Sequence, residues 1–251
     1  MSLSDLNNIL GDWPYEPNTV HARRIIATDG RPRIQLRLDL GVLQMELDGR
    51  PDGRHPHGFP SLLEYYREKE KALQGTDKES LLFGQSECSE LQQEAAQYYY
   101  RYIAYYSLRQ LDKVIEDTRH NIDLIELVDR HADDDELAWQ FLQFFPYVRM
   151  MNARAEGELA AERGNYDEAI AALEAGIEEI RSFWIDVGEE EETERTTRET
   201  SLLSDLLRTF QSAIPKTESD RLEEELARAI AVEDYERAAS LRDALRSLAP
   251  R

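Results

Sequence analysis

The chain has 251 residues, of which 41% are hydrophobic and 32% are charged, and its formal net charge is −21. This length allows a sizeable buried core, and the composition is typical of a soluble protein rich in surface helix. No apolar run approaches the ~18 residues that cross a membrane, and residues 1–5 lack the pattern of a signal peptide. The single cysteine, Cys88, excludes an internal disulfide and a multi-cysteine zinc site, so we expect a cytoplasmic location.

The charge is distributed unevenly along the chain. From Ala22 to Arg54 seven arginines stand against five acidic residues, which gives this segment a charge of +2 and leaves −23 for the remainder. Such an acidic chain repels phosphate backbones at long range, so the sequence argues against direct binding of nucleic acid. The asymmetry also marks residues 1–60 as a module of a different kind from the rest.

The segment 22–48 predicts β-structure. Asp29-Gly30 is a turn dipeptide, and Pro32 stands where a strand begins. Five apolar residues then alternate with polar ones before the apolar phase shifts by one residue: Ile34, Leu36, Leu38, Leu40 and Val42. The shift beside Gly41 indicates a β-bulge or a tight bend. We expect a small antiparallel sheet of two or three strands that packs on the helices after it.

A loop at residues 48–60 brings His, Asp and Arg close together in sequence. Its candidate ligand-binding residues are Arg50, Asp52, Arg54, His55 and His57. Histidine and carboxylate can ligate a metal or move protons near neutral pH, while arginines and glycine amides suit phosphate. The other interpretation is a solvated loop whose histidines cap or pack. The sequence has no HExxH-type spacing or further ligand nearby, so we assign no metal, cofactor or catalytic residue to it.

Helical patterns begin after this loop. Ser61-Leu62-Leu63-Glu64 has the form of a capping box and predicts a helix to about Leu73, ended by Gly75. A long helix is expected from near Ser89, and it carries six tyrosines between residues 98 and 106. Three of them lie on one side of that helix: Tyr98, Tyr102 and Tyr105. This stripe is either a groove for a peptide or, as is more common, core between helices.

The middle of the chain contains an internal repeat. Residues 156–170, Glu-Gly-Glu-Leu-Ala-Ala-Glu-Arg-Gly-Asn-Tyr-Asp-Glu-Ala-Ile, resemble a tetratricopeptide repeat, a unit of two packed helices. Gly157 and Ala169 permit a close helix crossing, and Gly164-Asn165-Tyr166 makes the turn. A second copy begins at Arg109 and can be laid over this turn, although it lacks the glycine and the alanine. The resemblance implies a stack of helices.

The last apolar pattern predicts a helical hairpin at residues 219–251. It follows an acidic run at residues 188–194, expected to be a solvated loop, and a helix that carries Leu202 to Phe210. Apolar residues then recur at three- and four-residue steps on both sides of a Glu-Asp break, from Leu222 to Ile230 and from Tyr235 to Leu248. Small residues after the break let the two helices approach closely, and Tyr235 can fill the space at the turn.

The centre of this hairpin resembles the UVR motif. That motif is the C-terminal helical hairpin of the excision-repair proteins UvrB and UvrC, and it also occurs in bacterial Clp-protease regulators and ATPases. The matching positions are Tyr235, Glu236, Ala238, Ala239, Leu241, Arg242 and Asp243, with Tyr in place of the more usual Phe. The resemblance implies contact with a protein partner or a second copy, and no catalysis. We add Leu222, Leu226 and Leu245 to the expected contact residues. The alternative is a hairpin that only closes the chain's own helical stack.

Motifs of catalysis and nucleotide binding are missing from the sequence, which has no GxxxxGK[ST], CxxC, GxSxG, HExxH or GxGxxG. We expect a mainly α fold with a small N-terminal antiparallel sheet, a tetratricopeptide-like domain over residues 61–214 and the hairpin. The function that these features predict is that of a non-enzymatic bacterial adaptor, which joins proteins and uses no cofactor. Two alternatives stay open: a ligand or metal sensor on the N-terminal module, with or without enzymatic activity, and an accessory protein of nucleotide excision repair that acts through a protein partner.

Overall fold

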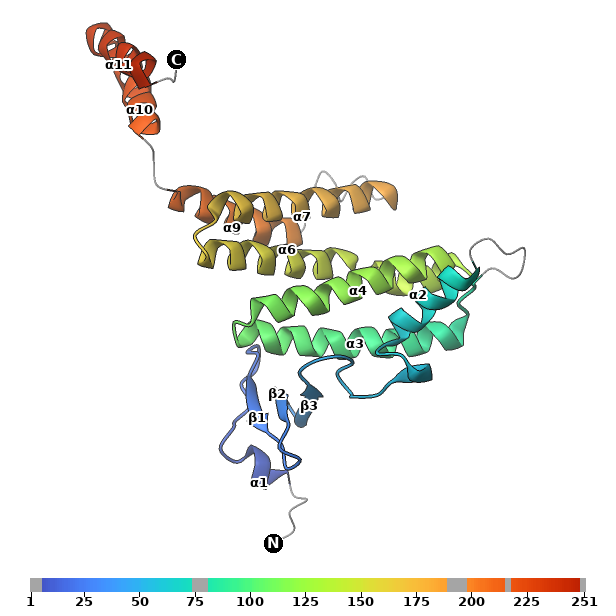
Figure 1. Cartoon of the computed structure of the whole chain (residues 1–251). Helices are drawn as coiled ribbons and strands as arrows, with labels where there is room; N and C mark the ends of the chain where they lie inside the picture. The colour runs from blue at the N-terminus through green and yellow to red at the C-terminus, as the bar shows by residue number, and fades with distance from the viewer. Residues whose placement is uncertain (1–5, 74–80, 189–197, 215–217, 249–251) are drawn as a thin grey trace. The chain divides into compact units, whose positions relative to one another are not determined.

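The computed structural model describes residues 6–73, 81–188, 198–214 and 218–248 (Figure 1). The chain forms two compact units, Met1–Leu207 and Arg208–Arg251. It is mainly helical, with a three-stranded antiparallel sheet near the N-terminus and a pair of helices at the C-terminus, which confirms the expected fold class. Over the described part of the chain, none of the helices combines the length and the apolar character that crossing a membrane requires.

A short helix, α1 (Asn7–Leu10), precedes the sheet of β1 (Ala22–Ile26), β2 (Pro32–Leu38) and β3 (Gly41–Glu46), which pair in the order β1-β2-β3. The prediction of one strand running through Leu40 to Val42 is wrong, because β2 ends at Leu38 and the chain reverses. The predicted tight bend at Gly41 is confirmed: Val42 pairs with Arg37, and Leu40 is 89% exposed at the turn. The shift in apolar phase therefore marks the passage from one strand to the next.

The apolar face of the sheet packs on a helix, as expected. Ile34, Leu36 and Met45 are buried, and both β1 and β2 contact α3 (Gln85–Ser107). A small sheet becomes stable when its apolar face packs against a helix, and α3 provides that packing surface here. The sheet and the helices after it thus belong to one unit.

Four long helices of the first unit follow one another as layers. They are α3, α4 (Leu111–His131), α6 (Phe145–Glu162) and α7 (Tyr166–Asp186), and each contacts the next along the series (Figure 1). Shorter elements fill in around them: the 3-10 turn η1 (Pro56–Gly58), α2 (Leu62–Leu73) and α5 (Asp135–Leu142). The first residues of α9 (Arg198–Ala213) complete the unit, where Leu203 is fully buried.

Of two predicted helix starts, that of α2 is confirmed and that of α3 is wrong. The cap at Ser61 is confirmed, because the Glu64 N–H donates to its hydroxyl at 3.1 Å. Helix α3 begins four residues before the predicted start near Ser89: its first residue is Gln85, and the Gly84 N–H donates to the carboxylate of Glu87 at 3.2 Å. Because glycine has no side chain that could cap the helix, the residue at position 84 gives no sequence signal of a helix start. The predicted stop at Gly75 and most of the acidic run lie outside the described residues.

One turn geometry joins three pairs of helices. In each, a residue with positive φ is followed by a residue whose N–H donates to the carbonyl five residues back. These pairs of residues are Arg109 (φ +56°) with Gln110, Gly164 (φ +79°) with Asn165, and Glu233 (φ +59°) with Asp234. The first two confirm the overlay of the repeat copies at the level of the turn, since Arg109 adopts the conformation without being glycine. Similarity to a tetratricopeptide repeat beyond this stays a prediction.

The crossing of α6 and α7 is close at two glycines. A Cβ on Gly157 would lie 3.0 Å from the Leu173 side chain and 3.2 Å from the Ala169 carbonyl, which confirms the expected close approach. Gly176 is tighter still, because a Cβ there would overlap that of Ala153 and lie 3.3 Å from Leu203. The sequence pattern did not single out Gly176.

Candidate functional site

The loop at residues 48–60 divides its predicted ligand residues between the interior and the surface. Arg50 is buried and lies 3.5 Å from a carboxylate oxygen of Glu94 on α3 and 3.3 Å from Asp52. Asp52 also accepts from Gln97 at 3.2 Å and from the Arg54 N–H at 3.0 Å. These contacts tie the start of the loop to α3 and give Arg50 a structural role.

The remaining candidates of this loop lie on its exposed part. Arg54, His55 and His57 are all exposed, and the His57 ring stacks on Tyr65 of α2 with 4.1 Å between ring centroids. Among the residues that the structure describes, no group of three or more His, Cys, Asp and Glu side chains is arranged to hold a metal ion. A ligand site on this loop stays a prediction, and Arg50 does not belong to its surface.

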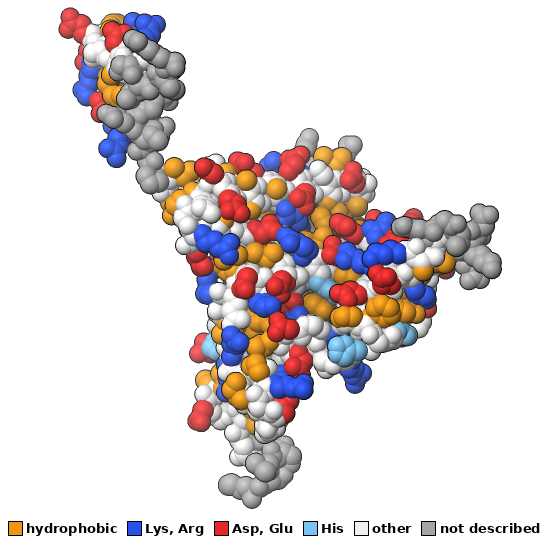
Figure 2. Space-filling view, viewed as in Figure 1, with side chains coloured by type: hydrophobic (Ala, Val, Ile, Leu, Met, Phe, Trp, Pro, Cys, Tyr) orange, Lys and Arg blue, Asp and Glu red, His pale blue; other side chains and the backbone are white. Residues whose placement is uncertain are grey.

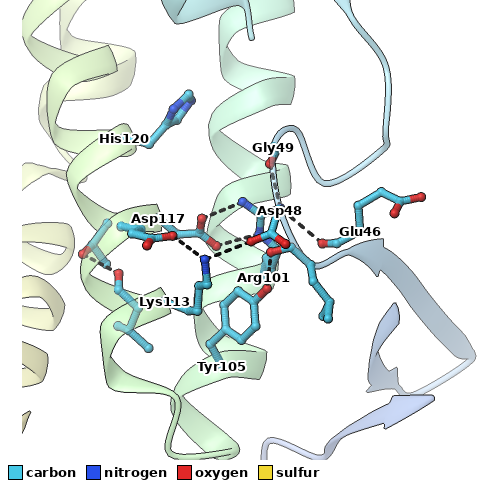
Figure 3. Close-up of polar contacts among 12 residues, drawn as sticks. Glu46, Asp48, Gly49, Arg101, Tyr105, Lys113, Asp117 and His120 are labelled. Carbon is cyan, nitrogen blue, oxygen red and sulfur yellow. Dashed lines mark hydrogen bonds and ion pairs between the residues drawn. The ribbon is translucent and has the colours of Figure 1, made fainter. Parts of the chain in front are cut away.

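A buried ion pair fixes the segment after β3 to the helices (Figure 3). Arg101 of α3 donates two hydrogen bonds to the carboxylate of Asp117 on α4, at 2.6 and 2.8 Å, and two more to the carbonyls of Glu46 and Gly49. Burial raises the pKa of Asp117, and the Arg101 guanidinium opposes that rise. Because both partners are almost fully buried, loss of either one leaves an uncompensated charge at a cost of about 3–5 kcal/mol.

Two further contacts reinforce this junction. The Tyr105 hydroxyl donates to the Leu47 carbonyl at 2.5 Å, and the Lys113 ammonium donates to Asp48 at 2.9 Å. The hydrogen bond from Lys113 holds the pKa of Asp48 below its ordinary value. In Figure 3 these side chains converge on the strand end from α3 and α4. All of them serve to dock the sheet on the helices.

Glu94 caps a neighbouring helix from a distance. Its fully buried carboxylate accepts from the N–H groups of Leu62 and Leu63 at the start of α2, at 2.8 and 3.1 Å. His120 lies 3.2 Å from the same carboxylate, and its ring stacks on Tyr98 at 3.6 Å. Both oxygens are occupied by fixed partners, so this Glu-His-Tyr cluster is explained by its structural role.

The tyrosine stripe is buried. Tyr98, Tyr102 and Tyr105 are 6%, 0% and 1% exposed. Tyr98 and Tyr105 make the core contacts described above, which corresponds to the second interpretation of the stripe. Tyr102 differs from them because it lines a cavity between helices together with Tyr99 and Tyr147. The sequence indicated the buried face of α3, but it gave no signal for a hollow beside it.

The second unit contains a helical hairpin built from α10 (Glu218–Ala231) and α11 (Tyr235–Leu248). Its small core consists of Ala229, Ala238 and Leu241, with Leu222 and Leu226 packed against it. Asp234 caps α11 by accepting from the Arg237 N–H at 3.1 Å, and Arg237 pairs with Glu225 across the hairpin at 3.2 Å. Three buried side chains form a core that contributes little stability by itself.

The predicted contact residues of the hairpin fall into two groups. Leu222, Leu226, Ala238 and Leu241 hold the two helices together. Outside that core lie Leu245, which is half-buried, and five exposed residues: Tyr235, Glu236, Ala239, Arg242 and Asp243. The expectation that Tyr235 fills the turn is wrong: Tyr235 is 69% exposed and lies outside the hairpin core of Ala229, Ala238 and Leu241.

Tyr235 belongs to an apolar surface at the turn. Ile230 is 54% exposed and Val232 is 75% exposed, and we call these two residues and Tyr235 the hairpin tip. Val232 was not among the predicted contact residues. It could have been found from its position, since an apolar residue inside a polar turn follows neither helix's buried phase.

The hairpin coincides with the part of the chain that resembles a known family. No curated protein and no solved structure matches the chain. The UvrB/uvrC motif matches residues 217–249, which confirms the UVR resemblance for the hairpin.

Proposed function

We propose that this chain is a non-enzymatic adaptor of the bacterial cytoplasm that binds a protein through its hairpin tip, while the helical layers of the first unit hold a second protein. The observation that carries this proposal is the tip itself, three large apolar side chains that are 54%, 75% and 69% exposed within a UvrB/uvrC motif. Burying a Val or Ile side chain contributes about 1.5–3 kcal/mol. A protein surface that covers the tip would gain this energy.

The occupant of the tip is a foreign protein or the hairpin of a second copy. UVR motifs are known from nucleotide excision repair proteins, so one form of the adaptor is an accessory repair protein that acts through its partner. Its net charge of −21 disfavours direct contact with DNA. The surface is consistent with this conclusion: on the face shown in Figure 2, basic side chains are interspersed with acidic ones.

The experiment changes the tip without changing the hairpin core. The test variant carries Val232→Ser and Tyr235→Ser, both at exposed positions. The control is Leu40→Ser, which removes an apolar side chain that is even more exposed, at 89%, from the first unit. Circular dichroism should show the same helix content in all three proteins, because none of these side chains packs in a core.

Two measurements then separate the possible occupants. If the tip binds a second copy, light scattering of the full chain gives a dimer that the tip variant converts to a monomer and Leu40→Ser leaves unchanged. If it binds a foreign protein, crosslinking in the source bacterium recovers a partner with the wild type and the control but not with the tip variant. A tip variant that keeps the same molar mass and the same crosslinked partners as the wild type would overturn the proposal.

A further inference from the structure

A cavity of about 420 Å³ lies in the first unit between α3, α4, α5 and the start of α6. Both α3 and α6 pack on α4, and the short helix α5 contacts α3 and α4, so the hollow lies where these packed elements meet. Among the residues that line it, Ile125, Phe141 and Val148 are each at most 4% exposed and belong to the core. Small-molecule sites in proteins have volumes of about 300–1,000 Å³, and the cavity has this size.

The cavity is open to solvent at one side. Phe144 is 52% exposed, Gln92 and Ala96 of α3 are exposed as well, and all three residues line the cavity. These three side chains form the mouth of the cavity. A molecule can therefore enter past them without separating the helices.

The accessible surface of the cavity is almost wholly apolar. None of the twelve described residues that line it is charged, although 32% of the residues in the whole chain are. Water in the cavity finds few hydrogen-bond partners, so an apolar molecule that displaces this water gains free energy. A charged molecule would lose its hydration there without meeting a counter-charge. The lining therefore favours a neutral, apolar occupant.

The same lining favours a small molecule over a segment of a partner protein. A peptide that entered the cavity would bring backbone N–H and C=O groups, which need hydrogen-bond partners when they leave water. The almost wholly apolar walls offer few such partners. A molecule without a peptide backbone avoids this cost.

Aromatic rings form part of the wall that a ligand can reach. Tyr99 of α3 and Tyr147 of α6 are half-buried, and with Phe144 they keep accessible surface while they line the cavity. The rings of Tyr99 and Tyr147 lie 6.3 Å apart, between centroids, and are inclined to each other by 55°. A flat ring that lies against both can meet the face of one and the edge of the other. Such arrangements attract aromatic rings beyond the effect of buried area.

We propose that this cavity binds a neutral, flat aromatic molecule, which is held by contact with Tyr99, Phe144 and Tyr147 and is selected by its lack of charge. The site is separate from the hairpin, because every residue that lines it lies between Gln92 and Val148. It therefore stands or falls independently of the adaptor function.

The first test is isothermal titration calorimetry of the full chain with two probes of similar size, toluene and benzoate. We expect toluene to bind with a Kd of about 0.1–1 mM, a strength typical of a very small apolar ligand. Benzoate should bind at least about tenfold more weakly, because its carboxylate either loses its water or stays near a chain of net charge −21. No binding of toluene up to its solubility limit, or binding of benzoate as tight as that of toluene, would overturn the proposal.

A second pair of probes tests the aromatic character of the ligand. Benzyl alcohol and cyclohexylmethanol have the same number of carbon atoms and the same hydroxyl group, and they differ in whether the ring is flat and aromatic. We expect benzyl alcohol to bind about two- to tenfold more tightly, the range expected for contact between aromatic rings. If cyclohexylmethanol binds equally well or better, the cavity is a site for aliphatic molecules and the proposal is wrong.

Variants at the mouth locate the binding. Ala96→Trp and Gln92→Trp each place a large side chain at an exposed lining position, so both proteins should fold normally and bind toluene more weakly. Gln93→Trp is the matched control, because Gln93 is exposed on the same helix but does not line the cavity, and it should leave the affinity unchanged. Toluene affinity that is the same in all three variants as in the wild type would place the ligand elsewhere and refute this site.

Discussion

The carboxylate of Glu158 on α6 has three side-chain partners. The Tyr106 hydroxyl and the Arg154 guanidinium donate to its carboxylate at 2.6 and 2.8 Å, and Arg109 pairs with it from the turn between α3 and α4. Burial alone would raise the pKa of Glu158, but the hydrogen bonds from these three residues outweigh it and hold that pKa below its ordinary value of 4.5. The folded protein therefore favours the charged carboxylate.

This shift predicts a specific loss of stability in acid. Because the folded pKa of Glu158 is lowered, its contribution is complete above the unfolded pKa and disappears as the pH falls through the folded value. Glu158→Gln should lower the free energy of unfolding by about 1–3 kcal/mol at pH 7. The difference between the two proteins should shrink as urea unfolding is repeated at decreasing pH below about 4.5.

A nearby carboxylate provides the control. Glu162 pairs with the same arginine, Arg109, at 2.5 Å, but half of its side chain is exposed. Exposed ion pairs contribute about 0–1 kcal/mol, so Glu162→Gln should change stability little at any pH. A pH-independent difference between the wild type and Glu158→Gln would show that Glu158 acts by packing alone.

Single residues also show where sequence reasoning works and where it stops. The cap at Ser61 and the close approach at Gly157 were predictable, because the residues that signal them lie within a few positions of the structure they make. The sequence predicts Arg50 to be a ligand residue of a surface loop, but its side chain is buried, because Glu94, 44 positions away, supplies its counter-charge. No local pattern reveals a partner at that separation.

At the scale of elements, the packing of α6 on α7 depends on Gly176. Alanine is a better helix former than glycine by about 1 kcal/mol. If there were free space beside Gly176, the Gly176→Ala change would therefore stabilise α7. Here the new Cβ would overlap that of Ala153. We therefore expect Gly176→Ala to lower the free energy of unfolding by about 1–3 kcal/mol, the usual cost of overpacking, as measured by chemical denaturation.

A second substitution tests whether the clash is the cause. Ala153→Gly removes the Cβ that the new methyl group meets, and alone it should cost about 1 kcal/mol through helix propensity. The double variant should be less destabilised than the sum of the two single variants, because contacting residues couple. Additive effects would mean that the helices separate freely and that Gly176 has no steric role.

Helices and strands were mostly predictable as elements, while their contacts were not. The apolar phase shift at Gly41 and the polar break at Glu233-Asp234 both marked real turns, since turn chemistry is local. The internal repeat predicted a stack of helices, but not which of α3, α4, α6 and α7 contact one another. The cavity arises where four elements meet without filling the space between them, and such a hollow depends on tertiary packing that periodicity does not describe.

The whole chain carries far more negative than positive charge, with 51 acidic and 30 basic residues. Buried pairs such as Arg101–Asp117 are screened little by salt, and exposed pairs such as Lys71–Glu68 contribute little at any salt concentration. The repulsion between uncompensated carboxylates opposes compaction of the chain. The main electrostatic effect of salt on the folded chain is therefore to weaken this repulsion.

Raising the ionic strength should accordingly stabilise the protein. From about 0.01 M to about 0.15 M salt the screening length falls from about 30 Å to about 8 Å, so the midpoint of thermal unfolding should rise over this range, in NaCl and KCl alike. Replacing Glu189, Glu190, Glu191 and Glu192 by Gln changes the formal net charge from −21 to −17 and should reduce the response. A midpoint that falls with salt would mean that attractive ion pairs, and not repulsion, dominate the electrostatics of this chain.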